Sequence, residues 1–298
     1  DPFIAKEIPN NQPNTSSYWQ STDTPLNTAP LTEHLQTDVV IVGSGYTGLG
    51  CAHHLVKNGV KDVHVLEANS IGWGCSSRNA GFVLPGSGRL GYQQLVQRFG
   101  QKQTMQLHEQ FIEAIDQVRS ITTESNTPID QTESGYLKLA HSSRYFDKLK
   151  ANAEYLHKNF NYDVEVIDHK AFSESYVKHR AAFGAIRYAN GFGINPLKLV
   201  NCYAKESLTN GARIHTNSPA LSIENINNKH LVKAPNGSIL ANKVVIASNG
   251  YSPAGFKTAI SGKILPVLTS VIVTRPLTSA EIESSGFKTH NVMMDTRE

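Results

Sequence analysis

Three glycines fall within residues 43–48, whose sequence is GSGYTG. This GxGxxG spacing is typical of a turn whose backbone amides approach the pyrophosphate of a dinucleotide. Gly43 permits the tight turn, Gly45 lets the backbone approach the phosphates, and Gly48 lets a helix pack closely on a strand. The phosphates would face the positive N-terminus of that helix. The motif therefore predicts a dinucleotide site, with an ordinary Gly-rich turn as the alternative for the glycines alone.

The elements around the glycines support the dinucleotide interpretation. Residues 38–42 form a short apolar, β-branched run, which is typical of a buried parallel strand, and apolar residues then recur at helical spacing from Tyr46 to Asn58. Residues 63–67 supply a second strand ending in Glu67. A carboxylate at this place accepts hydrogen bonds from ribose hydroxyls and would repel a 2′-phosphate, which disfavours NADP. NAD and FAD share the arrangement, so these residues leave both open.

A second small-residue stretch follows at residues 72–82, with the sequence GWGCSSRNAGF. Backbone amides in such a run can form a nest around phosphate oxygens, and Arg78 can neutralise charge nearby. A surface loop with incidental glycines is the alternative.

Composition excludes several classes of protein. The 298 residues carry a formal net charge of +3 without a basic block, so nucleic acid is not an expected partner. No apolar run approaches the roughly 18 residues of a spanning helix, and residues 1–36 lack the basic start and apolar run that are typical of a signal peptide. The 3 cysteines form no CxxC pair and the 12 histidines lack metal-ligand spacing, so we expect no disulfide framework and no metal. A cytoplasmic protein is the expectation.

The remaining pattern places the nucleotide-binding strands on both sides of another domain. Helical spacing predicts helices near residues 107–118, 146–160 and 195–210, and strands are expected near 135–140, 185–188, 212–215 and 244–247. A parallel sheet built from residues 38–67, 212–223 and 243–247 cannot be one contiguous N-terminal domain. The fold class expected is therefore α/β, with an α+β second domain inserted through the first.

Five stretches together resemble the FAD-dependent amine and amino-acid oxidoreductases of the glycine/D-amino-acid oxidase type, closest to gamma-glutamylputrescine oxidoreductase-like members. They are VVIVGSGYTGLG, VLEANSIGWGCSSRNAGF, GFGINPLKLV, GARIHTNSPALSI and VVIASNGYSP. The resemblance spans about Ser17 to Arg275. It implies a Rossmann-like FAD-binding domain at residues 37–90 with 196–260. An interleaved substrate domain of mixed sheet plus helices would occupy 91–195 with 261–298, after an irregular arm at 1–36.

The resemblance also implies which residues hold FAD. The pyrophosphate would lie on Gly43, Gly45, Tyr46, Thr47 and Gly48, the adenosine ribose on Glu67 beside Ala68, and the adenine against the backbone of Ala220. The loop under the pyrophosphate and flavin would be Ser76, Ser77, Arg78, Asn79, Ala80 and Gly81, and a second turn beside the cofactor would be Ala247, Ser248, Asn249 and Gly250. Relatives with covalent flavin have histidine at the position of Arg78. Arginine cannot form that bond, so non-covalent FAD is expected.

The reaction implied is oxidation of the C–N bond of a small-molecule amine or amino acid. Hydride would pass to flavin N5, the resulting imine would hydrolyse, and electrons would leave to oxygen or to a carrier. The flavin performs the difficult step, so no side-chain base is demanded. Lys263 is the one candidate catalytic residue, because some relatives carry a lysine near the flavin that assists oxygen reduction. Its offset from Pro266 differs from theirs, and a solvated lysine is the alternative.

One departure from the family pattern concerns length. Family members continue well past the strand near Arg275, with further substrate-domain strands and a glycine-rich segment against the flavin. The C-terminal part of the family fold is thus absent from this sequence. We expect a fragment, a second chain that supplies the remainder, or a truncated protein. An NAD-dependent dehydrogenase and a non-catalytic flavoprotein remain the alternative functions.

Overall fold

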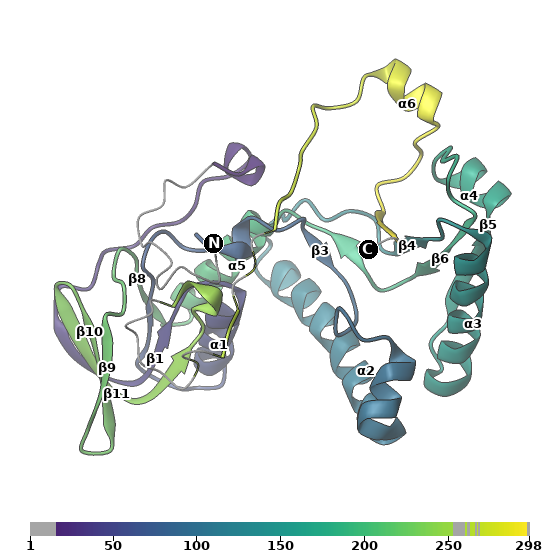
Figure 1. Cartoon of the computed structure of the whole chain (residues 1–298). Helices are drawn as coiled ribbons and strands as arrows, with labels where there is room; N and C mark the ends of the chain where they lie inside the picture. The colour runs from purple at the N-terminus through teal and green to yellow at the C-terminus, as the bar shows by residue number, and fades with distance from the viewer. Residues whose placement is uncertain (1–15, 253–259, 261–262, 266, 268, 297–298) are drawn as a thin grey trace. The chain divides into compact units, whose positions relative to one another are not determined.

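The computed structural model describes residues 16–252, 260, 263–265, 267 and 269–296. The chain divides into two compact units, one of residues 1–80, 125–129 and 195–272, and another of residues 81–124, 130–194 and 273–298 (Figure 1). Both contain helices and strands, which confirms the α/β class. No helix in the described part of the chain is long and apolar enough to cross a membrane.

The first unit is built on a six-stranded sheet with the order β8-β2-β1-β11-β10-β9. The strands are β1 (His34–Val42), β2 (Val63–Leu66), β8 (Arg213–His215), β9 (Ser222–Ile226), β10 (Lys229–Ala234) and β11 (Gly237–Ile246). Strand β1 pairs in parallel with β2 and β11, and β2 pairs in parallel with β8. Strands β9 and β10 extend the sheet, with β10 antiparallel to both β11 and β9. The β1-α1-β2 order is the βαβ unit that the sequence predicts.

The expected parallel strands are confirmed, and residues 222–234 add an antiparallel pair, β9 and β10, that the sequence analysis did not predict. Strands β9 and β10 are joined by Asn227 and Asn228, which both have positive φ, at 48° and 62°. Two left-handed residues in succession make the type of tight turn that returns a strand antiparallel to its neighbour. The chain therefore continues as a hairpin here, with no crossover helix.

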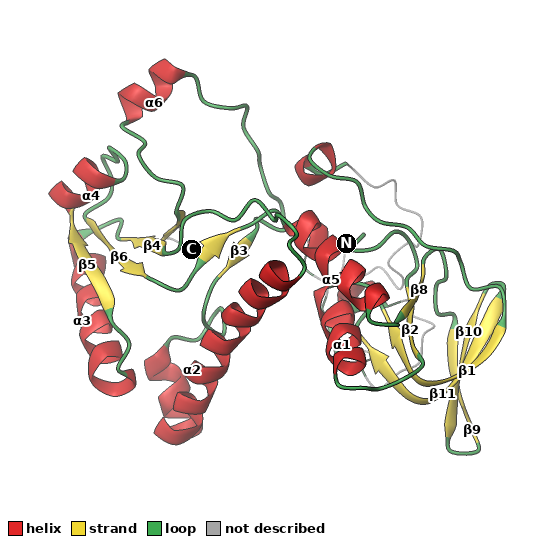
Figure 2. Cartoon of the chain, turned by 180° about the vertical axis from the view of Figure 1, so that it is seen from behind, coloured by secondary structure: helices red, strands yellow, loops and turns green. Residues whose placement is uncertain are grey.

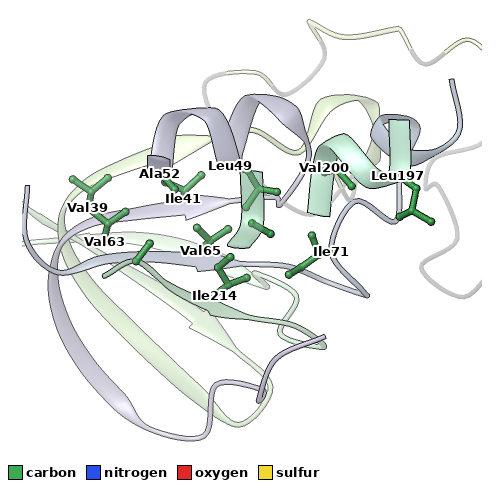
Figure 3. Packing of buried hydrophobic residues seen from close by; sticks show 12 residues of the cluster. Val39, Ile41, Leu49, Ala52, Val63, Val65, Ile71, Leu197, Val200 and Ile214 are labelled. Carbon is green, nitrogen blue, oxygen red and sulfur yellow. The ribbon is translucent and has the colours of Figure 1, made fainter. Parts of the chain in front are cut away.

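Two helices cover one face of this sheet, namely α1 (Tyr46–Lys57) and α5 (Pro196–Thr209). Alternate residues of β1 point to opposite faces, and Val39 and Ile41 belong to the same core cluster as Leu49 of α1 and Val200 of α5 (Figure 3). Pro196 begins α5, and the Asn195 side chain accepts hydrogen bonds from its first-turn amides. The core thus fixes both helices against the strands whose ends carry the predicted site.

The second unit holds a four-stranded mixed sheet with the order β12-β4-β6-β5. Its strands are β4 (Tyr136–Leu139), β5 (Val164–Asp168), β6 (Gly184–Tyr188) and β12 (Val292–Asp295), with a small separate pair, β3 (Phe82–Val83) and β7 (Phe192–Gly193). Its helices are α2 (Tyr92–Glu124), α3 (Ser143–Phe160), α4 (His169–Ser175) and α6 (Ser279–Ser285), shown in red in Figure 2. Helix α2 is interrupted at Gly100, which has φ 81°. The mixed sheet with helices confirms the expected second-domain class.

The predicted irregular arm differs from the structure at its end. Residues 1–15 lie outside the described residues, and a short 3-10 helix, η1 (Tyr18–Ser21), follows. Strand β1 begins at His34, so residues 34–36 pair with β11. The additional residues, His34 to Gln36, lie before the β-branched run and include one apolar residue, Leu35, which is too few for an alternation signal.

A pair of histidines, His64 buried and His215 half-buried, joins β2 to the edge strand β8. The His64 and His215 rings are stacked, and His64 Nδ1 lies 3.0 Å from His215 Nε2. His64 is 1% exposed. Burial, together with His215 and Arg213 and against a smaller opposing effect of Asp62, lowers the pKa of His64 from 6.5 to about 4. Burial and Arg213 also lower the pKa of His215, and Glu33 has a smaller effect in the opposite direction. Both rings are therefore neutral in the fold near pH 7.

We expect this pair to make the first unit acid-sensitive. The unfolded chain takes up the His64 proton below about pH 6.5, whereas the folded chain resists it down to about 4, so stability is complete above pH 6.5 and falls as the pH drops through this interval. At about 1.4 kcal/mol for each pH unit, the loss approaches roughly 3 kcal/mol. Denaturant unfolding at pH 7.5 and 4.5 measures it, with His64→Leu expected to flatten the dependence. The half-buried His230, changed to Ala, is the control and should keep the wild-type pH dependence. A pH dependence in His64→Leu equal to that of the wild type would contradict the assignment.

Candidate cofactor site

The turn between β1 and α1 is as tight as the glycine spacing predicts. Gly43 has φ +106°, and a Cβ on it would lie 2.6 Å from the carbonyl oxygen of Ala247. A Cβ on Gly48 would overlap the carbonyl oxygen of Gly43. Any side chain at either position would push the helix off the strand ends. The two glycines therefore bring the N-terminus of α1 to the carboxyl edge of the sheet.

The N-terminus of α1 is open to an anion. Gly45 is the N-cap residue and has no side chain to accept from the first-turn amides, and no acidic residue lies in that turn. Tyr46 N donates to Ser76 Oγ at 3.0 Å. A Cβ on Gly45 would come within 2.8 Å of the same hydroxyl. Amide donors at a helix start whose N-cap residue has no side chain, with the Gly45 backbone half-buried, fit the pyrophosphate of a dinucleotide.

Glu67 follows β2 directly and is fixed by the glycine turn. One carboxylate oxygen accepts from Ser44 N at 2.9 Å and from Ser44 Oγ at 2.6 Å, and the other accepts from Asn69 N at 3.0 Å. The residue is 9% exposed. The acid thus lies beside the turn, where the ribose interpretation requires it, and ties two strand ends together. Ser44 and Asn69 were not among the predicted site residues, because the motif places no constraint on them.

The loop after β2 is held together by its own side chains. It contains a 3-10 turn, η2 (Cys75–Ser77). Arg78 Nε donates to Trp73 O at 2.9 Å, and its guanidinium lies 5.8 Å from the centre of the Trp73 ring. Burial lowers the pKa of Arg78 from its ordinary value. Asn79 Nδ2 donates to the carbonyl oxygens of Cys75 and Ser76, each at 3.1 Å.

The remaining residues of the predicted loop differ in their surroundings. Ser77 is buried, whereas Ala80 is exposed, and Gly81 is the first residue of the second unit.

The turn after β11 meets the loop after β2. Ala247 N donates to Val42 O at 2.8 Å, which keeps the end of β11 against the end of β1. Asn249 has φ 51° and starts the 3-10 turn η3 (Asn249–Tyr251). The Tyr251 ring lies 5.6 Å from the Trp73 ring, edge to face, and its hydroxyl is 3.3 Å from Cys75 Sγ.

Tyr251 was not selected from the sequence, where an aromatic residue beside a sheet is more often core. Burial and Cys75 raise the pKa of its phenol to about 12, so the hydroxyl is protonated at neutral pH.

Three predicted residues remain, and each lies in a different part of the chain. Ala220 is buried against the strand face that includes Leu66, in the segment after β8. Ala68 is exposed immediately after Glu67. Lys263 is exposed on a turn in which its backbone amide donates to Ile260 O at 3.0 Å, and Pro266, against which it was aligned, lies outside the described residues. In the described part of the chain, the structure gives no contact between Lys263 and the other predicted site residues. It therefore does not support a catalytic role for Lys263.

The arrangement is that of a nucleotide site at a topological switch point. Strand β1 is flanked by β2 on one side and β11 on the other, and the turns after all three strands lie at the same edge of the sheet. Ligands of open α/β sheets bind in such a crevice, outside the carboxyl ends of the strands. Among the described residues there is no group of three or more His, Cys, Asp or Glu side chains that could hold a metal ion. The position of the three turns at the strand ends is what suits the site to a dinucleotide.

Comparison with known sequences gives the family. The family described as "DAO: FAD dependent oxidoreductase" matches residues 38–297. The chain is 28% identical over 272 residues to the "Probable oxidoreductase OrdL" of Haemophilus influenzae, covering 90% of this chain and 62% of the relative. It is 29% identical over 266 residues to the "Gamma-glutamylputrescine oxidoreductase" of Escherichia coli, covering 88% and 61%. The chain therefore spans about three fifths of the length of these relatives.

Comparison with solved structures supports the fold. Glycine oxidase from Geobacillus kaustophilus superposes with a TM-score of 0.59 at 21% identity, covering 73% of this chain and 56% of that one. The expected resemblance and the expected FAD dependence of the family are confirmed, and an NAD-dependent dehydrogenase is not favoured. None of these comparisons supports a second chain that completes the fold. The strand-end site and the family match agree, and the chain belongs to the DAO family of FAD-dependent oxidoreductases.

Proposed function

We propose that this chain binds FAD without a covalent bond and oxidises the C–N bond of a small amine or amino acid. The uncapped N-terminus of α1 at the switch point is the observation that carries the proposal, because its amides face the place where a pyrophosphate would lie. The family match and the relatedness to a gamma-glutamylputrescine oxidoreductase favour an amine or amino acid as the substrate class.

Each group of predicted cofactor-binding residues would hold a different part of FAD. Backbone amides of Gly45 to Gly48 would bind the pyrophosphate, Glu67 and Ala68 the ribose, and the segment at Ala220 the adenine. The loop at Ser76 to Gly81 and the turn at Ala247 to Gly250 would line the flavin side. Bound FAD supplies the acceptor of hydride from the carbon that bears the amine. The protein's own contribution is to bind and orient the reacting groups.

The electrostatics of the loop suit this role. Arg78 is fixed by Trp73 and places a cation in the loop, beside the predicted path of the diphosphate. A guanidinium forms charge-assisted hydrogen bonds to phosphate oxygens, which stabilises a bound anion. It offers no nucleophile for covalent attachment to flavin. This residue type supports the proposal that FAD is bound without a covalent bond.

The domain assignment is part of the same proposal. FAD binding belongs to residues 37–90 with 196–260, and substrate binding to residues 91–195 with 261–298. Electrons would leave to oxygen or to a carrier, and the imine product would hydrolyse in water. A cytoplasmic location is proposed with it, and cell fractionation of the native protein tests that point.

The direct test is reduction of bound FAD by substrate. The purified protein is loaded with FAD, and a panel of primary and secondary amines and amino acids is added without oxygen. We expect the visible flavin absorbance to bleach with at least one compound, because hydride transfer reduces the ring. FAD binding without bleaching across a broad panel would favour a non-catalytic flavoprotein, and absence of FAD binding would contradict the proposal altogether.

Two glycines of α1 provide a matched pair of variants. Gly48→Ala is expected to abolish FAD binding and to lower stability by more than about 2 kcal/mol, since its Cβ would overlap the Gly43 carbonyl. A Cβ added to Gly50, in the same helix, would meet nothing within 4 Å, so Gly50→Ala should raise stability by about 0.5–1 kcal/mol and leave FAD affinity unchanged. Thermal unfolding and FAD fluorescence titration measure both. Equal FAD affinity in the two variants would refute the close approach.

The absence of a covalent bond is tested separately. After denaturation and filtration of the FAD-loaded protein, we expect all of the flavin in the filtrate and a protein mass without an added flavin. The reason is that arginine occupies the position of the attaching residue. Flavin that stays with the denatured chain would disprove this part of the proposal.

A further inference from the structure

The N-terminal strap, which we define as residues 17–31, contacts three parts of the candidate cofactor site. It lies before residue 38, where the family match begins. Its partners are the loop after β2, the helix α5 and the segment after β8, all in the first unit. The strap therefore reaches both the flavin side and the adenine side of the proposed site.

The first contact holds the loop after β2. Trp19 Nε1 donates to the carbonyl oxygen of Asn79 at 2.9 Å. Asn79 in turn closes the loop through its own bonds to Cys75 and Ser76. The Trp19 ring packs against the core cluster between the sheet and the helices, and η1 fixes its backbone. An indole anchored in this way presents its single donor in one direction.

The second contact satisfies buried amides of α5. Asn201, which is 3% exposed, donates to Asp23 Oδ2 and to Thr24 O, each at 3.0 Å. Asn195, which is 1% exposed, donates to Thr22 Oγ1 at 2.8 Å. Buried polar groups need such partners, so removal of the strap would leave costly donors in the core.

The third contact fixes the segment after β8. Thr28 N donates to Thr216 Oγ1 at 3.0 Å, and Thr216 N donates to Thr28 Oγ1 at 3.2 Å. Leu31 N donates to Ser218 Oγ at 2.8 Å. This segment leads into Ala220, which is proposed to meet the adenine. The reciprocal bonds therefore hold the adenine side as Trp19 holds the flavin side.

We propose that the strap pre-organises the FAD site and that Trp19 is a positioning residue for the loop at residues 75–79. The inference rests on the proposed function for its ligand, FAD. A loop held in its bound conformation loses less freedom on binding, so the affinity rises without any new contact to the ligand. Trp19 acts through Asn79 and is not assigned a contact with FAD.

Trp19→Phe tests the first contact, because it keeps a ring and removes the donor. Removal of one hydrogen bond is expected to weaken FAD binding about fivefold, measured by fluorescence titration. Amide hydrogen exchange of residues 75–79 in the FAD-free protein should also become faster. Tyr18→Phe is the matched control, because it removes a hydroxyl from a half-exposed neighbour on the same turn and should change neither quantity.

Thr28→Val tests the other end of the strap. It removes the hydroxyl that donates to Ile214 O at 2.6 Å and accepts from Thr216. We expect faster exchange at residues 214–218, with residues 75–79 unchanged, and a similar loss of FAD affinity. Unchanged FAD affinity, or unchanged exchange at each contacted segment, would overturn the proposal. If the wild-type chain binds no FAD, the proposed function fails. Amide hydrogen exchange alone then decides whether the strap holds the two contacted segments.

Discussion

The candidate site depends on the contact between the first turn of α1 and the carbonyl of Gly43. Because Gly48 has no side chain, the helix backbone reaches this carbonyl, and its amides open at the end of β1. Gly43 in turn makes room for the Ala247 carbonyl, so the end of β11 lies against the same turn. Two close approaches of backbone to backbone therefore bring together segments that are far apart in the sequence. No side-chain interaction could replace them at that distance.

Polar contacts then orient what the glycines bring close. Glu67 receives two hydrogen bonds from Ser44 and one from Asn69, so the carboxylate is fixed before any ligand arrives. Ser76 accepts from Tyr46 at the helix start, and the Tyr46 hydroxyl donates to Pro196 O at 2.9 Å. Burial raises the pKa of that phenol, so it remains a donor. The helix start, the loop and α5 are thereby linked through one residue.

The sequence predicted the elements whose apolar residues recur at a regular spacing. Helix α1 was expected from Tyr46 to Asn58 and runs from Tyr46 to Lys57, because its apolar face and terminal glycine are local signals. The β9–β10 hairpin was missed, since its turn is formed by Asn227 and Asn228, which differ from the Asn-Gly pair that usually marks such turns. Residue types in a strand as short as β8 carry too little pattern to fix its pairing.

The site residues also divide into those that the sequence predicts and those that it does not reveal. Glycine spacing and an acid after a strand predicted Gly43, Gly45, Gly48 and Glu67 in positions that fit a nucleotide, since the backbone geometry restricts these residue types. Tyr251 was not selected, and its contacts with a thiol and an indole that are distant in the sequence follow no local pattern. Trp19 was not among the predicted site residues. Its hydrogen bond ends on a backbone carbonyl, which every residue has, so no pattern of side chains can reveal it.

Buried polar groups set the pairing register of a strand where apolar packing alone would allow more than one register. Strand β8 spans Arg213–His215 and contributes only Ile214 to the main core, so hydrophobic contact alone would tolerate a slip. A slip would break the His64–His215 hydrogen bond and the bonds that Glu67 makes through its backbone to His215 O and Ser218 N. Each broken bond would leave a buried donor or acceptor unsatisfied. The position of the adenine side of the site is therefore specified by hydrogen bonds, whereas the pyrophosphate side is specified by the space that glycine leaves.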